Sequence, residues 1–402
     1  MPLGKNPLML IINIVLWAVA FYFGFRGFTL KRPQTKDQAM WLRISAFISG
    51  DLPPILLCGI MLGYNYYPTI GDPKSFNPMQ IFIMISLFVM GINIKKEDWQ
   101  RLVRAPKPIV FGVAVKWILM PLAAFGIGYF AFEVLGVAAG MKPETAGLMT
   151  IACTMLGTTP TGAASNTLTL IGRGDLTLSV SVTAINNVLT PFLMPTILYL
   201  LLSKSLGDQG LKLPTGQIFS DLITTVLIPV VVGSVIGMIF PKQVEKIKPI
   251  TAPIAVICLC GLMMSSMARG AAAMLKQLIV VPFVFIASVI YGFVAMVVGY
   301  FLPRLPFLKL TEAQCRALTF ENMIENASLA QTILALHFAQ NPIMLIMPLV
   351  YGKWQQVMSA VIILPMYQRI DDRLAEKHLT AAEVTAQHDP RHEHDNKDSH
   401  GV

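Results

Sequence analysis

Residues 316–336, RALTFENMIENASLAQTILAL, form an apolar run that is interrupted by acidic and amide side chains. Glu321 and Glu325 are the two carboxylates, and each is followed directly by an asparagine. An ionised side chain near the centre of a bilayer costs roughly 2.5–3.5 kcal/mol, so such residues usually face a cavity and bind ions or substrate. We therefore expect the rest of the chain to form a scaffold around this stretch.

The composition is that of a protein that crosses a lipid bilayer many times. Of the 402 residues, 54% are hydrophobic and only 13% are charged, which is too apolar for a soluble globule. The net charge is +9, but the lysines and arginines lie in short loops between apolar runs, where they act as a topology signal. We therefore discard nucleic-acid binding. The five cysteines show no metal or redox spacing, which predicts packing roles.

Eleven apolar spans predict an all-α membrane protein. Basic residues predominate in the loops on one side of these spans, and the loops on the other side are nearly neutral. This asymmetry predicts a multi-pass protein of the cell (inner) membrane with its N-terminus outside and its C-terminus in the cytoplasm. The expected spans are 7–25, 52–67, 79–94, 109–132, 147–171, 176–202, 218–240, 250–267, 278–302, 317–338 and 343–364.

The two ends of the chain extend beyond the main domain, residues 44–366. Residues 1–43 are expected to form an extra transmembrane helix and a cytoplasmic linker, because their positive charge follows the apolar run, whereas a signal peptide carries it in front. Residues 367–402 are polar and contain five of the six histidines. We expect a disordered cytoplasmic tail there rather than a metal-binding one, since it has few apolar residues to bury.

Two of the spans are predicted to be interrupted in the middle. Residues 156–166, LGTTPTGAASN, contain Pro160 between two glycines, which should divide the helix. Residues 321–328, ENMIENAS, are the second candidate, with a weaker local signal because they lack glycine and proline. Without the first helix, these are the fourth and ninth of ten spans, which predicts two inverted five-helix repeats, 44–203 and 204–366. Inverted repeats whose broken helices cross are typical of transporters.

The span that follows the first interruption offers further oxygen ligands. Ser179 and Thr183 are four residues apart, so they share one helix face. Singly, hydroxyl side chains in membrane helices mostly bond their own preceding carbonyl. Together with Ser165, Asn166 and Glu321, however, they supply the hydroxyl, amide and carboxylate oxygens that a hard cation prefers.

One cationic side chain is expected deep in the membrane. Lys116 lies near the middle of the span 109–132, where its ammonium group is too far from either surface to snorkel. It should therefore pair with a carboxylate. Glu321 and Glu325 are the carboxylates available at comparable depth.

These residues together resemble the bile acid:sodium symporter family, whose members carry organic anions with sodium. The resemblance covers about residues 44–364 and implies a bacterial-type member with an extra N-terminal helix, which is not an enzyme and has no cofactor besides Na⁺ as coupling ion. It rests on a combined pattern: MGINIKKEDW at 90–99, PTGAASN at 160–166, RGDLTLSVSVTA at 173–184 and FENMIENASLA at 320–330.

The resemblance implies a first sodium site on Ser165, Asn166, Ser179, Thr183 and Glu321. The family's second sodium site uses the same glutamate, here Glu321, together with a glutamine on the third helix and the glutamine of a Gln-Asn pair. Those two positions are Lys116 and Glu325 in this chain. We hypothesise that the Lys116 ammonium takes the place of the second sodium and pairs with Glu325, with Glu321 as a further candidate partner. Transport would then be coupled to one sodium ion, or to one sodium ion and a proton. A purely structural salt bridge is the alternative.

Substrate contacts are implied at the N-termini of the two second half-helices, whose dipole ends and amide donors favour a carboxylate or sulfonate. The family's usual threonine before the Ala-Ser-Asn triplet is Ala163 here, although Thr161 offers a hydroxyl nearby. The implied substrate-binding residues are Thr161, Gly162, Ala163, Ala164, Asn326, Ala327 and Ser328.

We therefore predict sodium-coupled symport of a small organic anion by alternating access, with a proton-coupled or uncoupled carrier of the same fold as the alternative. An arsenite or auxin-type efflux carrier is disfavoured because the first interruption has no thiol at its centre. An intramembrane hydrolase could use Glu321 and Glu325 as an acid/base pair, but no activated nucleophile accompanies them. A sensor with a metal- or partner-binding tail is the remaining alternative.

Overall fold

The computed structural model describes residues 79–94, 106–247 and 276–376, except 163, 209, 211, 212 and 307, together with the single positions 251, 254 and 258. The expected N-terminal helix, the span 52–67, most of the span 250–267 and residues 377–402 lie outside the described residues. Among the described residues all regular structure is helical, as predicted. Four helices are long and apolar enough to cross a membrane: Pro106–Gly136, Leu176–Ser203, Thr215–Ile239 and Val280–Arg304.

The span that carries Lys116 contains a widened turn. It begins with α6 (Pro106–Ala114), continues through the π-helical turn η2 (Val115–Leu119) into α7 (Met120–Gly128) and ends with η3 (Tyr129–Gly136). In η2 the Met120 N–H donates to the Val115 carbonyl, five residues back. The next residue, Pro121, has no N–H and cannot continue the regular ladder, so the turn widens where Lys116 lies. Such π-turns are frequent at functional sites.

Both predicted interruptions are present, and they meet. The first divides α8 (Pro143–Gly157) from α9 (Ala164–Ile171), and the second divides α15 (Glu312–Met323) from α16 (Ala327–His337). The two extended segments pair in antiparallel directions: the Gly162 N–H donates to the Ile324 carbonyl at 2.8 Å, and the Asn326 N–H donates to the Pro160 carbonyl at 2.9 Å. The backbone groups released by one break are therefore satisfied by the other.

The second break is supported from α17 (Ile346–Met358). The Tyr351 hydroxyl donates to the Met323 carbonyl at 2.7 Å. The Gln355 side chain accepts from the Glu325 N–H at 2.9 Å and donates to the Glu325 carbonyl at 3.2 Å. These tertiary bonds replace the ones that a continuous helix would make, which explains a break without glycine or proline.

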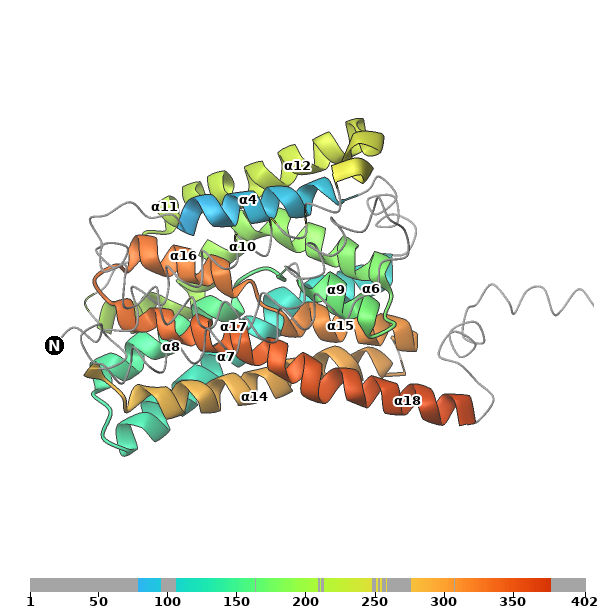
Figure 1. The fold of residues 1–402 in the computed structure, drawn as a ribbon. Helices are drawn as coiled ribbons and strands as arrows, with labels where there is room; N and C mark the ends of the chain where they lie inside the picture. Colours follow the sequence, from blue (N-terminus) through green and yellow to red (C-terminus); the bar gives the residue numbers. More distant parts are fainter. Residues whose placement is uncertain are drawn as a thin grey trace, which may run out of the picture.

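Two helices form one edge of the molecule (Figure 1). There α4 (Met79–Ile92) and α12 (Ile228–Ile239) lie side by side, and α14 (Val280–Phe301) lies toward the opposite edge. Glycines bring the first two backbones together: a Cβ atom at Gly233 would lie 2.4 Å from the Phe88 carbonyl oxygen. The 33-residue α10 (Leu176–Asp208) lies below this pair in the view, and α16 of the second broken helix also contacts α4. The shorter elements are α11 (Thr215–Leu222), η4 (Ile223–Leu227), η5 (Leu302–Arg304) and η6 (Pro342–Leu345).

The last span continues further than expected. After η7 (Ser359–Ile363) the chain forms α18 (Leu364–Glu376), so the first ten residues of the expected tail are helical. The reason is that this segment does have side chains to bury: Tyr367 is 1% exposed, and its ring lies edge-on to Phe320 at 5.9 Å between centroids. The boundary at residue 367 is therefore corrected to the end of α18.

Candidate functional site

The Glu321 carboxylate collects hydroxyl groups from two other helices. It lies in the last turn of α15, and its Oε1 accepts from Ser165 of α9 at 2.8 Å and from Ser179 of α10 at 2.5 Å. The Thr183 hydroxyl, one turn further along α10, lies 3.0 Å from Oε1 and 2.9 Å from Oε2. All four side chains are buried. The predicted face of α10 therefore points at the predicted carboxylate.

The oxygen atoms around Glu321 outnumber the hydroxyl protons available to form hydrogen bonds between them. The single proton of the Ser179 hydroxyl faces both Glu321 Oε1 and Asn166 Oδ1, the latter at 2.9 Å. Ser165 Oγ and Thr183 Oγ1 lie 3.5 Å apart. A cation among these oxygens would satisfy them all, and the donors are the hard ligands that an alkali cation prefers. The five residues implied as the first sodium site thus lie together.

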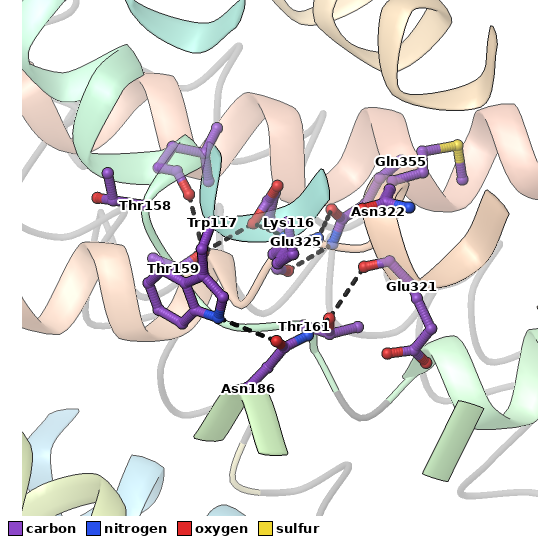
Figure 2. Close-up of polar contacts among 12 residues, drawn as sticks. Lys116, Trp117, Thr158, Thr159, Thr161, Asn186, Glu321, Asn322, Glu325 and Gln355 are labelled. Carbon is purple, nitrogen blue, oxygen red and sulfur yellow. Dashed lines mark hydrogen bonds and ion pairs between the residues drawn. The ribbon is translucent and has the colours of Figure 1, made fainter. Parts of the chain in front are cut away.

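The Lys116 ammonium lies 2.5 Å from Glu325 Oε2, and both side chains are at most 1% exposed (Figure 2). The Thr159 hydroxyl donates to the same oxygen at 3.0 Å, and the Tyr291 hydroxyl donates to Glu325 Oε1 at 2.6 Å. The carboxylate therefore has an opposite charge and the Tyr291 donor, and it shares the single Thr159 proton with the Leu156 carbonyl, which lies 2.8 Å from the same hydroxyl. Such partners are needed if a buried ion pair is to offset its desolvation.

The two glutamates have different partners, although both lie at a depth in the membrane from which they could pair with Lys116. Glu321 makes no ion pair with Lys116, and its carboxylate faces hydroxyl groups. Glu325 lies four residues later, beyond the point where α15 ends, so its side chain leaves the backbone in another direction. The break in the helix thus separates an oxygen cluster from an ion pair.

A chain of hydrogen bonds links the two groups of residues (Figure 2). Trp117 Nε1, next to Lys116, donates to Asn186 Oδ1 at 2.9 Å, and Asn186 Nδ2 donates to the Thr161 hydroxyl at 3.2 Å. Thr161 in turn donates to the backbone carbonyl of Glu321 at 2.9 Å. Since Thr161 is fully buried and its hydroxyl is engaged on both sides, it offers no donor to a ligand in this conformation.

The other residues implied for substrate lie around the two helix starts. α9 begins at Ala164 and α16 begins at Ala327, and Asn326 and Ser328 are 9% and 8% exposed. The Asn326 side chain accepts from the Leu329 N–H at 3.1 Å, so it caps its own helix. A Cβ atom at Gly162 would lie 3.0 Å from the Glu325 carbonyl oxygen, which accounts for the glycine. Ala163 lies outside the described residues.

Sequence reasoning missed several residues that support the site. Thr159, Tyr291 and Gln355 hold the carboxylate or the backbone of Glu325, and Trp117 joins the two groups through Asn186, which the sequence places one turn beyond Thr183. Their signal was weak but present: each is a polar side chain inside an apolar span. Which of them points toward the breaks depends on how the helices pack, which the sequence alone does not give.

A model described as the Sodium Bile acid symporter family matches residues 80–278. Over these residues, just under half of its length, the chain is similar to this family. Among curated proteins it is 25% identical over 320 residues to the uncharacterized sodium-dependent transporter YocS of Bacillus subtilis (strain 168), covering 80% of this chain and 92% of that protein. It is 27% identical to the ileal sodium/bile acid cotransporter of Mus musculus (71% and 77% covered) and 27% identical to the sodium-dependent organic anion transporter of the same species (77% and 80%).

The family and these relatives are transporters rather than enzymes, so the predicted transport class stands and the hydrolase reading does not. The apolar helices agree with a membrane protein. The kind of membrane and the orientation of the termini stay predictions.

Proposed function

We propose that this chain is a secondary transporter that carries a small organic anion together with one sodium ion by alternating access. The observation that carries this proposal is the convergence of three hydroxyls on the Glu321 carboxylate, beside the point where two broken helices cross. The relatives named as sodium-dependent transporters of bile acids and organic anions support the same cation and the same class of substrate.

The sodium ion is proposed to bind among Ser165, Asn166, Ser179, Thr183 and Glu321. On binding, each hydroxyl proton would turn away and its oxygen lone pair would face the cation. The charge of Glu321 is then compensated by sodium. The half-helix starts at Ala164 and Ala327 lie nearby and present positive dipole ends, which favour the anionic group of the substrate.

The Lys116 ammonium is proposed to take the place of a second sodium ion. It is a fixed positive charge, 2.5 Å from the Glu325 carboxylate, close to the crossing where that ion would otherwise bind. A monovalent anion carried with one sodium ion would move no net charge. Coupling to a proton is the second candidate, and the observation that favours it is the buried, hydrogen-bonded pair itself, since a proton could move between Glu325 and Lys116.

The antiparallel pairing of the two breaks supports a repeat of inverted topology. In such a design, the two halves of the chain enter the crossing from opposite sides of the membrane. We propose residues 44–203 and 204–366 as these halves. The helices α4 and α12 would belong to a panel against which the broken helices move.

Thermal unfolding of the purified protein tests the cation site without a known substrate. We expect sodium to raise Tm relative to potassium at equal ionic strength, because a ligand that binds only the folded state stabilises it. Glu321→Gln should abolish this difference. The exposed Glu144 at the start of α8 provides a control: Glu144→Gln should keep it. Equal Tm values for wild type in both salts would contradict the proposal.

A further inference from the structure

A surface pocket of about 420 Å³ is lined by residues of η7 and α18. One end of its lining is apolar and the other is basic. None of the lining residues that the structure describes is acidic. These residues are Val361, Ile362, Pro365, Met366, Arg369, Ile370 and Arg373.

The basic end consists of Arg369 and Arg373, which are four residues apart and so share one helix face. Both are exposed, and neither forms an ion pair with another described residue. Guanidinium groups bind phosphate through paired hydrogen bonds. Two of them beside each other therefore favour a ligand with a phosphate group.

Of the three acidic residues in α18, Asp371 is directed away from the pocket, and the side chains of Asp372 and Glu376 lie outside the described part of the structure. Asp371 receives the buried Arg316 guanidinium at 2.7 Å and Arg173 at 3.3 Å. It lies two residues from Arg369 and from Arg373, and therefore on the other side of α18. The Asp371 carboxylate is paired with Arg316 and Arg173, so it does not neutralise the two arginines of the pocket.

The apolar end continues the membrane span. Val361 is 67% exposed, and Ile362, Pro365 and Met366 follow along the same side toward the arginines. Apolar side chains at the end of a span face lipid tails, and arginines just beyond them lie at the level of the lipid headgroups. Apolar side chains thus come first along η7 and α18 and arginines follow them, which matches a phospholipid whose acyl chains lie deeper in the membrane than its phosphate.

We propose that this pocket binds an anionic phospholipid, with its phosphate on Arg369 and Arg373 and the start of an acyl chain along Val361, Ile362 and Met366. This goes beyond the transport function and does not depend on it. The opposite face of α18 is tied to the transport machinery, because Arg316 of α15 also donates to Glu312 at 2.9 Å and to the Gly172 carbonyl, just after α9, at 3.1 Å. A bound lipid would therefore stabilise a helix that contacts both broken helices.

Native mass spectrometry of the detergent-purified full chain tests the proposal, with phosphatidylglycerol and phosphatidylcholine of equal chain length as probes. Wild type should retain phosphatidylglycerol preferentially, and Arg369→Gln/Arg373→Gln should lower that preference about tenfold or more, since each basic residue near an anionic lipid contributes about a factor of five. Lys242→Gln/Lys246→Gln is the matched control: these lysines are exposed, have the same spacing and lie on the same predicted side, outside the pocket.

The control should keep the preference of wild type, and Arg369→Lys/Arg373→Lys should keep part of it, because charge remains while the paired hydrogen bonds are lost. Equal retention of the two lipids by wild type would overturn the proposal. So would an unchanged preference in the glutamine variant, or an equal loss in the lysine control. An unaltered Tm in lipid-free detergent shows that the glutamine variant is folded.

Discussion

Glu321 and Glu325 show what single residues in this sequence do and do not reveal. Their cost in a membrane span marks both as functional, and the hydroxyls at helical spacing identify the partners of Glu321. Depth in the membrane does not decide which of the two pairs with Lys116, and the choice of Glu325 rested on the family resemblance alone. Only the direction in which each side chain leaves the broken helix separates them, and that direction is set by tertiary contacts.

Removing one member of the buried ion pair should destabilise the protein strongly. Lys116→Met leaves the Glu325 carboxylate buried without its counter-charge, at an expected cost of about 3–5 kcal/mol. Lys116→Met/Glu325→Gln removes both charges and should recover much of that loss. The free energy of unfolding in mixed micelles measures both variants. A double variant no more stable than Lys116→Met would show that the two charges are not coupled.

The Ser179 hydroxyl should contribute to sodium affinity. Ser179→Ala removes one of the donors that converge on Glu321, and we expect the apparent Kd for sodium to rise about tenfold. Ser181, two residues along α10, is equally buried but donates to the Thr177 carbonyl of its own helix. Ser181→Ala should therefore leave the Kd unchanged. A sodium titration of Tm measures both, and equal effects would argue against the site.

The two broken helices differ in how far their interruption can be predicted. Pro160 and its neighbouring glycines break the first helix by local chemistry, so the sequence alone suffices. The second break depends on Tyr351 and Gln355, which come from a helix about thirty residues later. No local signal records such support, and the matching place in the second half was the only indication. The end of α18 was also missed, because the buried Tyr367 sits among polar residues.

Gln355 should be important for the second break. Gln355→Leu leaves both the N–H and the carbonyl of Glu325 without their partner, at an expected cost of about 1–3 kcal/mol for each unsatisfied group. The neighbouring Gln356 is exposed, so Gln356→Leu should change the free energy of unfolding by less than about 0.5 kcal/mol. Similar stabilities of the two variants would mean that the break does not depend on α17.

The molecule as a whole brings a glycine-packed pair, α4 and α12, beside the helices that hold the site (Figure 1). The apolar composition and the loop charges were enough to predict an all-α membrane protein. They were not enough to predict this packing. Nothing in the sequence shows that Gly91 and Gly233 lie where the backbones of two helices come too close for a Cβ atom. The predicted N-terminal helix, the expected span 52–67 and most of the expected span 250–267 lie outside the described residues.

A side chain at Gly233 should separate the pair. Its Cβ atom would lie 2.4 Å from the Phe88 carbonyl oxygen, and backbone cannot move aside cheaply. We expect Gly233→Ala to destabilise the protein by about 1–3 kcal/mol, as overpacking does. Gly126 in α7 has nothing within 4 Å of the same position, so Gly126→Ala should be neutral or stabilising by up to about 1 kcal/mol. The free energy of unfolding of the two variants measures this difference. If Gly233→Ala left that free energy unchanged, the close packing of α4 and α12 would be contradicted.

The Lys116 ammonium is proposed to replace a second sodium ion. Equilibrium binding of radioactive sodium to the purified protein tests it directly and needs no substrate. Wild type should bind about one ion, and Lys116→Gln/Glu325→Gln should bind about two, the number expected when both sites of this design are open. Two ions in wild type, or none, would contradict the claim.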